Sequence, residues 1–166
     1  MTSNLPNARV AELIALLGLQ PHPEGGAYAE VHRSASSVAP SDGRGARPAL
    51  TSIHFLLTAN GASRWHRVTS DEVWVHLEGA PLRLYLLDET QHQLEQVVLG
   101  PVQQGRRPQH TVPAGRWQAA TCEGDYSLVA CIVAPGFQFD DFTLLDPDSE
   151  LAAWWLDAHS ALAHLL

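Results

Sequence analysis

The sequence is short of positive charge and of long apolar segments. It has 10 lysine and arginine residues against 18 aspartate and glutamate residues, a formal net charge of -8 and a pI near 5.5. A protein that binds nucleic acid or an anionic membrane surface over a broad area needs a basic patch, so we expect neither partner. No apolar run approaches the roughly 18 residues that a membrane-spanning helix needs.

The sequence also shows no evident signal peptide and no C-x-x-C motif. The first residues, MTSNLPNARV, lack the charged and then apolar segments of a signal peptide, so we expect a cytoplasmic protein. Cys122 and Cys131 are the two cysteines, and they have no C-x-x-C spacing. We expect a reduced pair of small core residues. The hairpin that they flank leaves a cross-strand disulfide geometrically possible, although a cytosolic disulfide would be unusual.

The order of predicted elements indicates an all-β protein. At 166 residues the chain has the length of one domain, which we place at 1–166. Apolar periodicity predicts a helix at 7–17 and a second one at about 148–164. The intervening region, about 20–146, has short β-rich runs separated by turn signals and no alternating helices. The runs are TSIHFLLT, EVWVHLEG, LRLYLLD, QVVLG, HTVPAG and YSLVACIVA. This pattern predicts an antiparallel barrel or jelly roll with short helices at the N- and C-termini.

The stretch SRWHRVTSDEVWVHLEG, residues 63–79, carries the strongest chemical signal. Strand alternation puts Glu72, Trp74 and His76 on one face, and His66 arrives from the preceding segment. Arg64 has the same parity as His66, so the two side chains point the same way if that segment is extended. Such a face is typical of a polar pocket lining, but a solvent-facing polar strand face would have the same pattern.

Two motifs in this stretch and beyond resemble those of the cupin superfamily. Glu72 is followed by six residues and then Gly79, as in the second half of the first cupin motif. Pro113-Ala-Gly-Arg-Trp-Gln118 resembles the second motif, Pro-x-Gly-x-x-His, except at its last position. The two motifs occur in the right order in an all-β chain, which favours the cupin double-stranded β-helix, or jelly roll.

Longer segments make the resemblance more specific. The stretches HPEGGAYAEVHRS, SIHFLL, SRWHRV, SDEVW, VPAGRWQAA and SLVACIVAPGFQFDDF are similar to the cupin family of unknown function 985, also called cupin 5. This resemblance covers nearly all of residues 18–146. It implies a jelly roll similar to sugar-nucleotide epimerases of the deoxyrhamnose pathway, and it implies a homodimer. Val75 and His76 depart from the residues we expect in many relatives.

The cupin resemblance also raises the question of a metal. A metal-binding cupin uses two histidines and the glutamate of the first motif and the histidine of the second. Here Arg64 occupies the first histidine position and Gln118 occupies the last, so that only His66 and Glu72 remain. A guanidinium beside a divalent cation is unfavourable because it repels the cation and keeps its proton. We therefore predict no cofactor; a weak transition-metal site at His66 and Glu72 would have to recruit His54 or His76.

The same residues are typical of a small-molecule site. We predict His66 and Glu72 as the catalytic pair, since a carboxylate beside an imidazole fixes its tautomer and draws its pKa towards neutrality. A structural pair without substrate is the alternative. The predicted ligand-binding residues are Tyr28, Glu30, Ser52, His54, Arg64, Trp74, His76, Trp117 and Gln118. An apolar cavity with a few converging polar groups is the usual form of such a site, and Arg64 would favour an anionic ligand.

The segment HPEGGAYAE raises a separate possibility. Gly25 and Gly26 allow unusual backbone angles or the close approach of another backbone. By resemblance to the epimerases, Tyr28 and Glu30 would reach across the dimer to the neighbouring pocket; an edge strand with polar tips is the alternative. The epimerases pair their histidine base with a tyrosine acid, and the corresponding residues 134–137 contain no tyrosine.

Three functions remain open from the sequence. The first is a metal-independent enzyme of the isomerase or epimerase type acting on a small polar substrate such as a sugar derivative. The second is a non-catalytic protein that binds a small ligand in the same cavity. The third is a metal-dependent cupin enzyme with an unusual ligand set.

Overall fold

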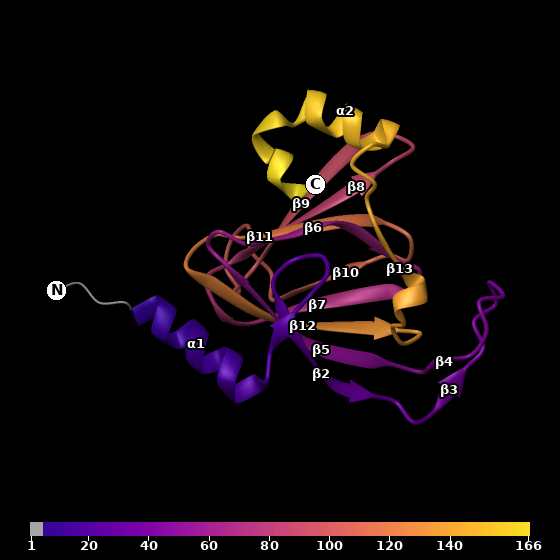
Figure 1. The fold of residues 1–166 in the computed structure, drawn as a ribbon, viewed down its shortest axis with the longest axis horizontal. Helices are drawn as coiled ribbons and strands as arrows, with labels where there is room; N and C mark the ends of the chain where they lie inside the picture. The colour runs from indigo at the N-terminus through magenta and orange to yellow at the C-terminus, as the bar shows by residue number, and fades with distance from the viewer. Residues whose placement is uncertain (1–4) are drawn as a thin grey trace.

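The computed structural model describes residues 5–166, with side chains from Ala8 onward, and its strands form two antiparallel sheets that pack face to face (Figure 1). The larger sheet contains, in spatial order, β1 (Gln20–Pro21), β2 (Ala27–Arg33), β5 (Thr51–Thr58), β12 (Tyr126–Ala134), β7 (Asp71–Gly79) and β10 (Gln109–Val112). The smaller sheet contains β13 (Phe142–Leu144), β6 (Ala62–Val68), β11 (Trp117–Cys122), β8 (Leu82–Asp88) and β9 (Gln93–Leu99). This is the all-β jelly roll that the sequence predicted.

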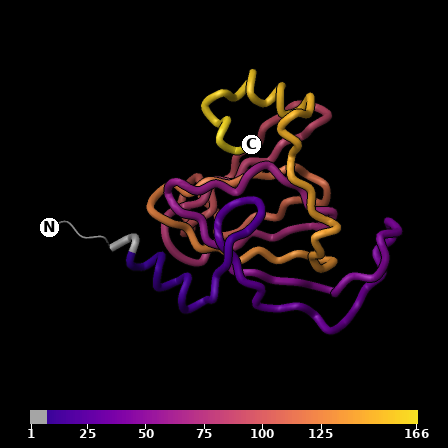
Figure 2. The backbone as a smooth tube through the Cα atoms, in the orientation of Figure 1, coloured from indigo at the N-terminus to yellow at the C-terminus, as the bar shows by residue number. Residues whose placement is uncertain are grey.

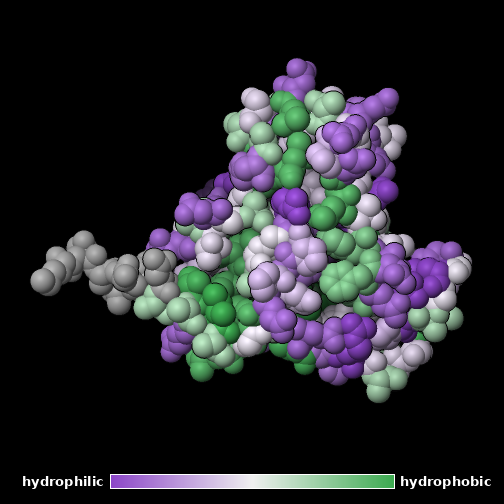
Figure 3. Space-filling model, in the orientation of Figure 1, coloured by the Kyte–Doolittle hydropathy of each residue, from purple (hydrophilic) through white to green (hydrophobic). Residues whose placement is uncertain are grey.

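Each sheet has a helix on its outer face. The helix α1 (Leu5–Leu17) packs Leu13 against Leu56 and Leu128 of the larger sheet. At the other side, α2 (Glu150–Ala158) and the 3-10 helix η2 (Ser160–Leu165) cover the smaller sheet. The backbone trace shows α1 and α2 on opposite sides of the two sheets (Figure 2). In the space-filling view, apolar side chains gather around α1 at the left (Figure 3).

A short two-stranded arm projects from the larger sheet. The strands β3 (Ser37–Val38) and β4 (Arg47–Pro48) pair with each other between β2 and β5 in the sequence, and they extend to the right in Figure 1. The polar, glycine-containing loop at the tip of this arm gives the right side of Figure 3 its hydrophilic colour. A single 3-10 turn, η1 (Phe139–Asp141), lies between β12 and β13.

The space between the sheets is divided into two parts. Towards one end, fully buried apolar side chains fill it, among them Leu57, Leu84 and Val129. Towards the other end, the same strands β5, β7 and β12 line a cavity with Thr51, Glu72 and Val133. Apolar packing therefore holds the two sheets together at one end and leaves room for a site at the other.

Several local predictions can be compared with the structure. The first helix ends at Leu17 and Gly18 follows in a left-handed conformation, as the sequence indicates for a helix C-terminus. The second helix is shorter than expected, because His159 leaves the helical conformation and the chain turns so that Leu165 becomes buried. Both cysteines are free, and Cys131 is buried. In residues 5–166, no helix has the length and apolar character to cross a membrane.

Candidate functional site

A cavity of about 140 Å³ opens between the two sheets. Its walls come from β2, β5, β6, β7 and β12, together with the turn after β1 and the segment that follows β12. Apolar and aromatic side chains supply most of the wall, and the ionisable side chains at its centre and mouth are His22, Glu24, Glu30, Arg33, His66, Glu72 and Cys131. An enclosed apolar space with a few converging polar groups is the usual form of a small-molecule site.

Glu24 reaches the cavity because two glycines let the turn before β2 approach the sheets closely. Gly25 and Gly26 both have positive φ angles, 110° and 69°. A Cβ at Gly25 would collide with the backbone carbonyl oxygen of Ala62, and one at Gly26 would lie 2.8 Å from the carbonyl oxygen of Leu56. The close backbone approach that the sequence allowed is therefore present, and it carries Glu24 inward.

Glu24 lies between two histidines. Its Oε2 atom is 3.3 Å from His66 Nε2 and 3.4 Å from His22 Nδ1. Its Oε1 atom accepts a 2.8 Å hydrogen bond from the hydroxyl of Ser63. The Glu24 side chain is only 7% exposed, so no bulk water is available to solvate a charge there. Burial accordingly raises the pKa of Glu24 to about 8.

Glu72 is held by a chain of two buried hydrogen bonds. The indole N–H of Trp74 donates to Gln118 Oε1 at 2.9 Å, and an indole nitrogen is a donor only. The amide nitrogen of Gln118 must then face the other way, and it donates to Glu72 Oε2 at 2.6 Å. Burial raises the pKa of Glu72 to about 7, so that this carboxyl changes its charge near neutrality.

Burial disfavours the charged form of both cavity histidines. His66 is 1% exposed, and burial lowers its pKa although the nearby Glu72 opposes the change. Burial and the neighbouring His66 lower the pKa of His22 to about 4. The rings of His22 and Tyr28 meet edge to face with centroids 4.6 Å apart. Two histidines with lowered pKa values and two carboxyls with raised pKa values therefore share one small cavity.

Three phenylalanines close the cavity, two from the segment after β12 and one from the first position of β13. This aromatic strap, residues 136–142, places Phe137, Phe139 and Phe142 on the cavity wall. The Phe142 ring lies against His66 at 5.5 Å between centroids. Phe139 is 53% exposed and marks the mouth. The strap therefore shields the buried ionisable groups from solvent.

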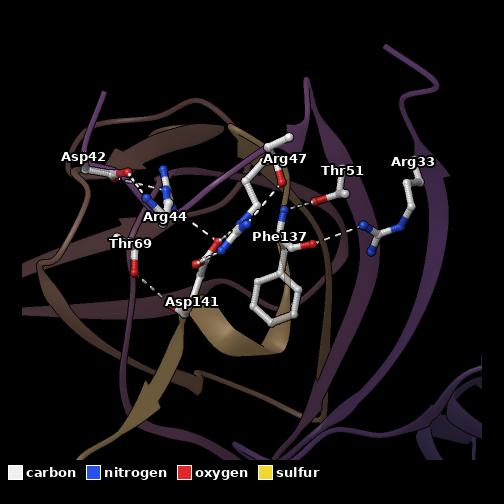
Figure 4. Close-up of polar contacts among 9 residues, drawn as sticks. Arg33, Asp42, Arg44, Arg47, Thr51, Thr69, Phe137 and Asp141 are labelled. Atoms are coloured by element: carbon white, nitrogen blue, oxygen red, sulfur yellow. Dashed lines mark hydrogen bonds and ion pairs between the residues drawn. The ribbon is translucent and has the colours of Figure 1, made fainter. Parts of the chain in front are cut away.

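Polar contacts with the arm and the larger sheet hold the aromatic strap in place (Figure 4). Arg47 makes a bidentate pair with Asp141, with nitrogen–oxygen distances of 2.7 and 2.9 Å. These bonds lower the pKa of Asp141. At the other end of the strap, the Phe137 N–H donates to Thr51 Oγ1 and the Phe137 carbonyl accepts from Arg33. Both ends of the strap are thus fixed to the arm and to strands that line the cavity.

Arg33 is the guanidinium at the cavity mouth. It lines the cavity, and its side chain is 41% exposed. It also pairs with Glu30 through two hydrogen bonds of 2.9 and 2.6 Å. Among the described residues that line the cavity it is the one arginine, and there is no lysine. This guanidinium is the positive charge among the described lining residues, and the Glu30 carboxylate balances it.

The predicted site residues fall into three groups. His66, Glu72, Tyr28 and Glu30 line the cavity. Gln118 and Trp74 lie behind Glu72, outside the lining, and hold it by the bonds described above. The side chains away from the cavity are those of Ser52, His54, Arg64, His76 and Trp117.

Strand alternation accounts for most of the residues in the last group. Ser52 and His54 alternate with the cavity-lining side chains of β5 and therefore lie on the other face of the larger sheet. His76 Nε2 instead lies 3.0 Å from the carbonyl oxygen of Ala80. Trp117 is on the α2 side of the smaller sheet, where its indole nitrogen donates to Glu89.

The position of Arg64 contradicts the expected parity. The pairing of β6 with β11 passes from His66 opposite Gln118 to Ser63 opposite Ala120, so β6 contains an extra residue there. A β-bulge of this kind changes the direction of the neighbouring side chains. Ser63 therefore joins His66 inside, whereas Arg64 is exposed and donates to the carbonyl of Pro23.

The sequence reasoning did not identify His22, Glu24 and Arg33 as site residues. His22 and Glu24 belong to the HPEGG segment, whose double glycine indicated a close approach but gave no assignment to the cavity. The two adjacent glycines were the available signal, because their positive φ angles form a turn packed closely against another strand. Arg33 comes from the end of the predicted Tyr28-containing strand, β2.

Two of the four ligand positions of a metal-binding cupin do not face this cavity, since Arg64 and Gln118 lie outside its lining. Within residues 8–166, no three or more histidine, cysteine, aspartate or glutamate side chains are arranged to hold a metal ion. Gln118 donates to Glu72 in place of ligating. His66 has its Nδ1 atom 2.7 Å from the carbonyl oxygen of Arg64 and keeps Nε2 on the cavity side. The two ligand positions occupied by Arg64 and Gln118 are thus lost in the structure as well as in the sequence.

The fold and the enclosed site between two jelly-roll sheets define a cupin. Residues 11–145 match the family model described as cupin superfamily (DUF985). A hypothetical protein from Leishmania major is 34% identical with a TM-score of 0.78, and a protein from Shewanella oneidensis is 35% identical with a TM-score of 0.81. Each alignment covers 93% of this chain and 94% of the other. The chain therefore belongs to the DUF985 family of the cupin superfamily.

More distant structures share the fold alone. Oxalate decarboxylase from Bacillus subtilis is 12% identical, with a TM-score of 0.56, and the alignment covers 88% of this chain and 36% of that one. No curated protein matches the chain.

Proposed function

We propose that this protein binds a small polar or anionic molecule in the cavity and acts on it by acid–base chemistry of the isomerase or epimerase type. The observation that carries the proposal is the burial of His66 and Glu72 on the wall of one enclosed cavity. Ionisable groups are costly to bury, and perturbed pKa values in a cavity are typical of catalytic sites. The base of this centre, the Glu72 carboxylate or the His66 imidazole, removes a proton from the substrate.

The size and charge of the cavity limit the class of ligand that it can bind. Its volume of about 140 Å³ is below the roughly 300–1,000 Å³ of sites for drug-sized ligands. We therefore expect a molecule the size of a small sugar or organic acid, or the reacting end of a larger one. Arg33 at the mouth favours a carboxylate or phosphate group at the outer end of that ligand. The predicted contact to an anion thus moves from Arg64 to Arg33.

Binding without catalysis is the second candidate, and one observation favours it. Both ring nitrogens of His66 and one oxygen of Glu72 already have partners inside the chain. A cavity whose polar groups are satisfied in this way serves a binding protein as well as an enzyme. Deuterium uptake by a bound ligand in D₂O separates the two candidates, because only the enzyme exchanges a carbon-bound proton.

We also propose a homodimer formed through the outer face of the larger sheet and the strand around Tyr28. The exposed apolar side chains Val31 and Leu77 belong to this sheet, and the buried His54 Nδ1 has no hydrogen-bond partner among the described residues. A second copy on that face would cover these groups and the sheet edge. A monomer in sedimentation at micromolar concentration would refute the dimer.

A thermal-shift screen, followed by a measurement of deuterium exchange into each bound compound, tests the proposed function. The panel consists of 2-oxo acids, sugar acids, and aldose and ketose phosphates, which combine an anionic group with a carbonyl or hydroxyl carbon. A ligand that binds only the folded state must raise the melting temperature. Each compound that does so is then incubated with protein in D₂O and examined by NMR. We expect the rise in melting temperature to be lost in Arg33→Gln. We expect deuterium exchange into the bound compound to be lost in His66→Gln. Failure of the whole panel to shift the wild-type protein would count against the proposal.

A further inference from the structure

Glu24 is a buried carboxyl that the proposed function leaves without a role. It lies in the cavity wall beside His66, and it comes from the double-glycine turn rather than from a cupin motif. Within residues 8–166, no arginine or lysine lies within ion-pair distance of its carboxyl group. The atoms around this carboxyl differ in whether they hold a hydrogen or present a lone pair.

The proton of His66 is on its Nδ1 atom. That atom is 2.7 Å from the backbone carbonyl oxygen of Arg64, and a carbonyl oxygen can only accept a hydrogen bond. In the neutral ring, Nε2 therefore presents a lone pair. This lone pair is the group that faces Glu24 Oε2 at 3.3 Å.

His22 presents a lone pair to the same oxygen. The backbone N–H of Glu24 donates to His22 Nδ1 at 3.3 Å, so Nδ1 is an acceptor and the proton of this ring is on Nε2. His22 Nδ1 is also 3.4 Å from Glu24 Oε2. Two imidazole lone pairs therefore converge on one carboxyl oxygen, and a carboxylate at that position would be repelled by both.

A proton on Glu24 Oε2 satisfies every contact at once. Oε2–H then donates to His66 Nε2, with His22 Nδ1 beside it, while Oε1 acts as the carbonyl oxygen that accepts from Ser63. The charged alternative, a Glu24 carboxylate paired with a doubly protonated His66, requires two charges in a space from which water is excluded. Burial opposes it from both sides, since burial raises the pKa of Glu24 and lowers the pKa of His66.

We propose that Glu24 is held as a neutral carboxylic acid and is the general acid of the cavity, the role for which the sequence offered no tyrosine. This inference rests on the proposed acid–base function. It also points to a substrate with a carbonyl oxygen that can receive a proton, placed at the inner end of the cavity, with the anionic group outward at Arg33. A neutral carboxyl in an apolar cavity is an effective hydrogen-bond donor to such an oxygen.

The proposed step transfers two protons. The Glu72 carboxylate takes a proton from the carbon next to the carbonyl, and the C–H electron pair forms a carbon–carbon double bond. The substrate oxygen replaces His66 Nε2 as the acceptor of the Glu24 Oε2 hydrogen. The carbonyl π pair moves to this oxygen, which takes the proton, leaving an enol, a neutral Glu72 and a Glu24 carboxylate. While the enol is bound, the Glu72 carboxyl exchanges its proton with solvent. The reverse transfers then restore both side chains, and the carbon receives a solvent-derived proton. The step needs no oxidant or reductant.

The groups facing Glu24 come from four parts of the chain. They are His22 in the same turn, Arg64 and His66 on β6, Glu72 on β7 and Cys131 on β12. Arg64 lowers the pKa of Glu24, but burial outweighs it. Ionisation of Glu24 is also opposed by a second carboxyl in the same cavity, since like charges at short range resist coexisting.

NMR of the ligand-free protein tests the position of the proton. In the wild-type protein near neutral pH we expect His66 neutral and protonated at Nδ1, and His22 neutral and protonated at Nε2. We also expect one glutamate carboxyl carbon at the chemical shift of a protonated acid, which disappears in Glu24→Gln. A doubly protonated His66 beside an ionised Glu24 would overturn the inference. So would about one transition-metal ion per chain that is lost in Glu24→Gln, because a cation would then occupy the place of the proton.

Enzyme kinetics tests whether the Glu24 proton is used in catalysis. The substrate is the panel compound that exchanges its carbon-bound proton for deuterium. A glutamine side chain keeps the hydrogen-bonding shape of a neutral glutamic acid. We therefore expect Glu24→Gln to fold, to bind the compound with little change in KM, and to lose about 10²- to 10⁴-fold in kcat. Glu95→Gln, at an exposed glutamate of β9, is the matched control and should be unchanged. Wild-type turnover in Glu24→Gln would overturn the acid role alone. Absence of turnover in the wild-type protein itself would overturn the proposed function and the acid role with it.

Discussion

The two faces of β6 bury neighbouring residues in opposite kinds of surroundings. Trp65 points towards α2, where it meets Trp155 edge to face at 4.8 Å between ring centroids in a cluster of apolar side chains. His66 points the other way, between two buried carboxyls and a second histidine. Both Trp65 and His66 are only 1% exposed.

This difference distinguishes the side chains that stabilise the fold from the side chains that belong to the candidate site. Burial of apolar surface contributes about 25 cal/mol per Å², so the Trp65 side is favourable by itself. Burial of ionisable groups is unfavourable unless hydrogen bonds compensate it, so the His66 side contributes little or costs stability. Groups that are retained at such a cost are the better candidates for function. Four predictions test this contrast, from the largest expected effect to the smallest.

The largest effect should come from the apolar side. Trp155 is fully buried under α2, and Trp155→Ala removes its packing against Trp65 and leaves a cavity. We expect the free energy of unfolding to fall by about 3–5 kcal/mol, as for other large-to-small changes at buried aromatic residues. Urea unfolding measures this. The panel compound should still bind to the folded fraction, and a selective loss of binding would show that the two faces are not independent.

The second effect is a pH dependence of stability that Glu24 creates. Its pKa in the folded protein is raised to about 8 from 4.5, so between these values the folded state holds a proton that the unfolded chain has lost. The free energy of unfolding should therefore fall as the pH rises through this window, with a slope of at most about 1.4 kcal/mol per pH unit. His22, with its pKa lowered to about 4, acts in the opposite sense below pH 6.5.

The difference between wild-type protein and Glu24→Gln isolates this slope. Denaturant titrations of both proteins at a series of pH values should show the wild-type protein losing stability relative to the variant as the pH rises from 4.5 towards 8. The reason is that the glutamine variant cannot titrate at this position, whereas the two side chains are equally uncharged at low pH. Parallel curves would mean that the pKa of Glu24 is not raised in the folded state.

A smaller, local effect is expected at the aromatic strap. Asp141→Asn weakens the bidentate pair with Arg47 that fixes one end of residues 136–142 (Figure 4). We expect faster amide hydrogen exchange in the strap and weaker ligand binding. Thr143→Ser, at an exposed position just beyond the strap, is the control. Unchanged exchange in Asp141→Asn would mean that the phenylalanine packing alone holds the strap.

The smallest effect should follow metal removal. Arg64 and Gln118 occupy two of the four cupin ligand positions, and His66 and Glu72 have partners within the chain. We expect far less than one transition-metal ion per chain in purified protein and no change in melting temperature after treatment with a chelator. One metal ion per chain, lost on His66→Ala/Glu72→Ala, would contradict this prediction and favour the metal-dependent cupin enzyme over the other two functions.

The sequence predicted the jelly roll well because the information is repeated along the chain. Short β-rich runs separated by turns and two cupin motifs in order both indicate this fold. Strand alternation from Glu72 to Trp74 also holds, since both side chains are buried between the sheets. The pair His66 and Glu72 lies at the cavity for the same reason.

The rest of the site depends on irregular backbone, which periodicity does not describe. The bulge in β6 turns Arg64 outward, and one extra residue is enough to reverse the expected parity. The turn at Gly25 and Gly26 brings in Glu24 from a segment outside the cupin motifs. Both departures come from single local features whose effect is set by tertiary packing.

The central claim is that His66 and Glu72 form a working centre rather than a structural pair, and His66→Gln tests it most directly. Stability and deuterium exchange into the panel compound are measured on the same preparation. We predict that exchange is abolished while the free energy of unfolding changes by no more than about 1 kcal/mol, within the usual range for point mutants. A strongly destabilised variant whose folded fraction still binds and exchanges at the wild-type rate would contradict the claim.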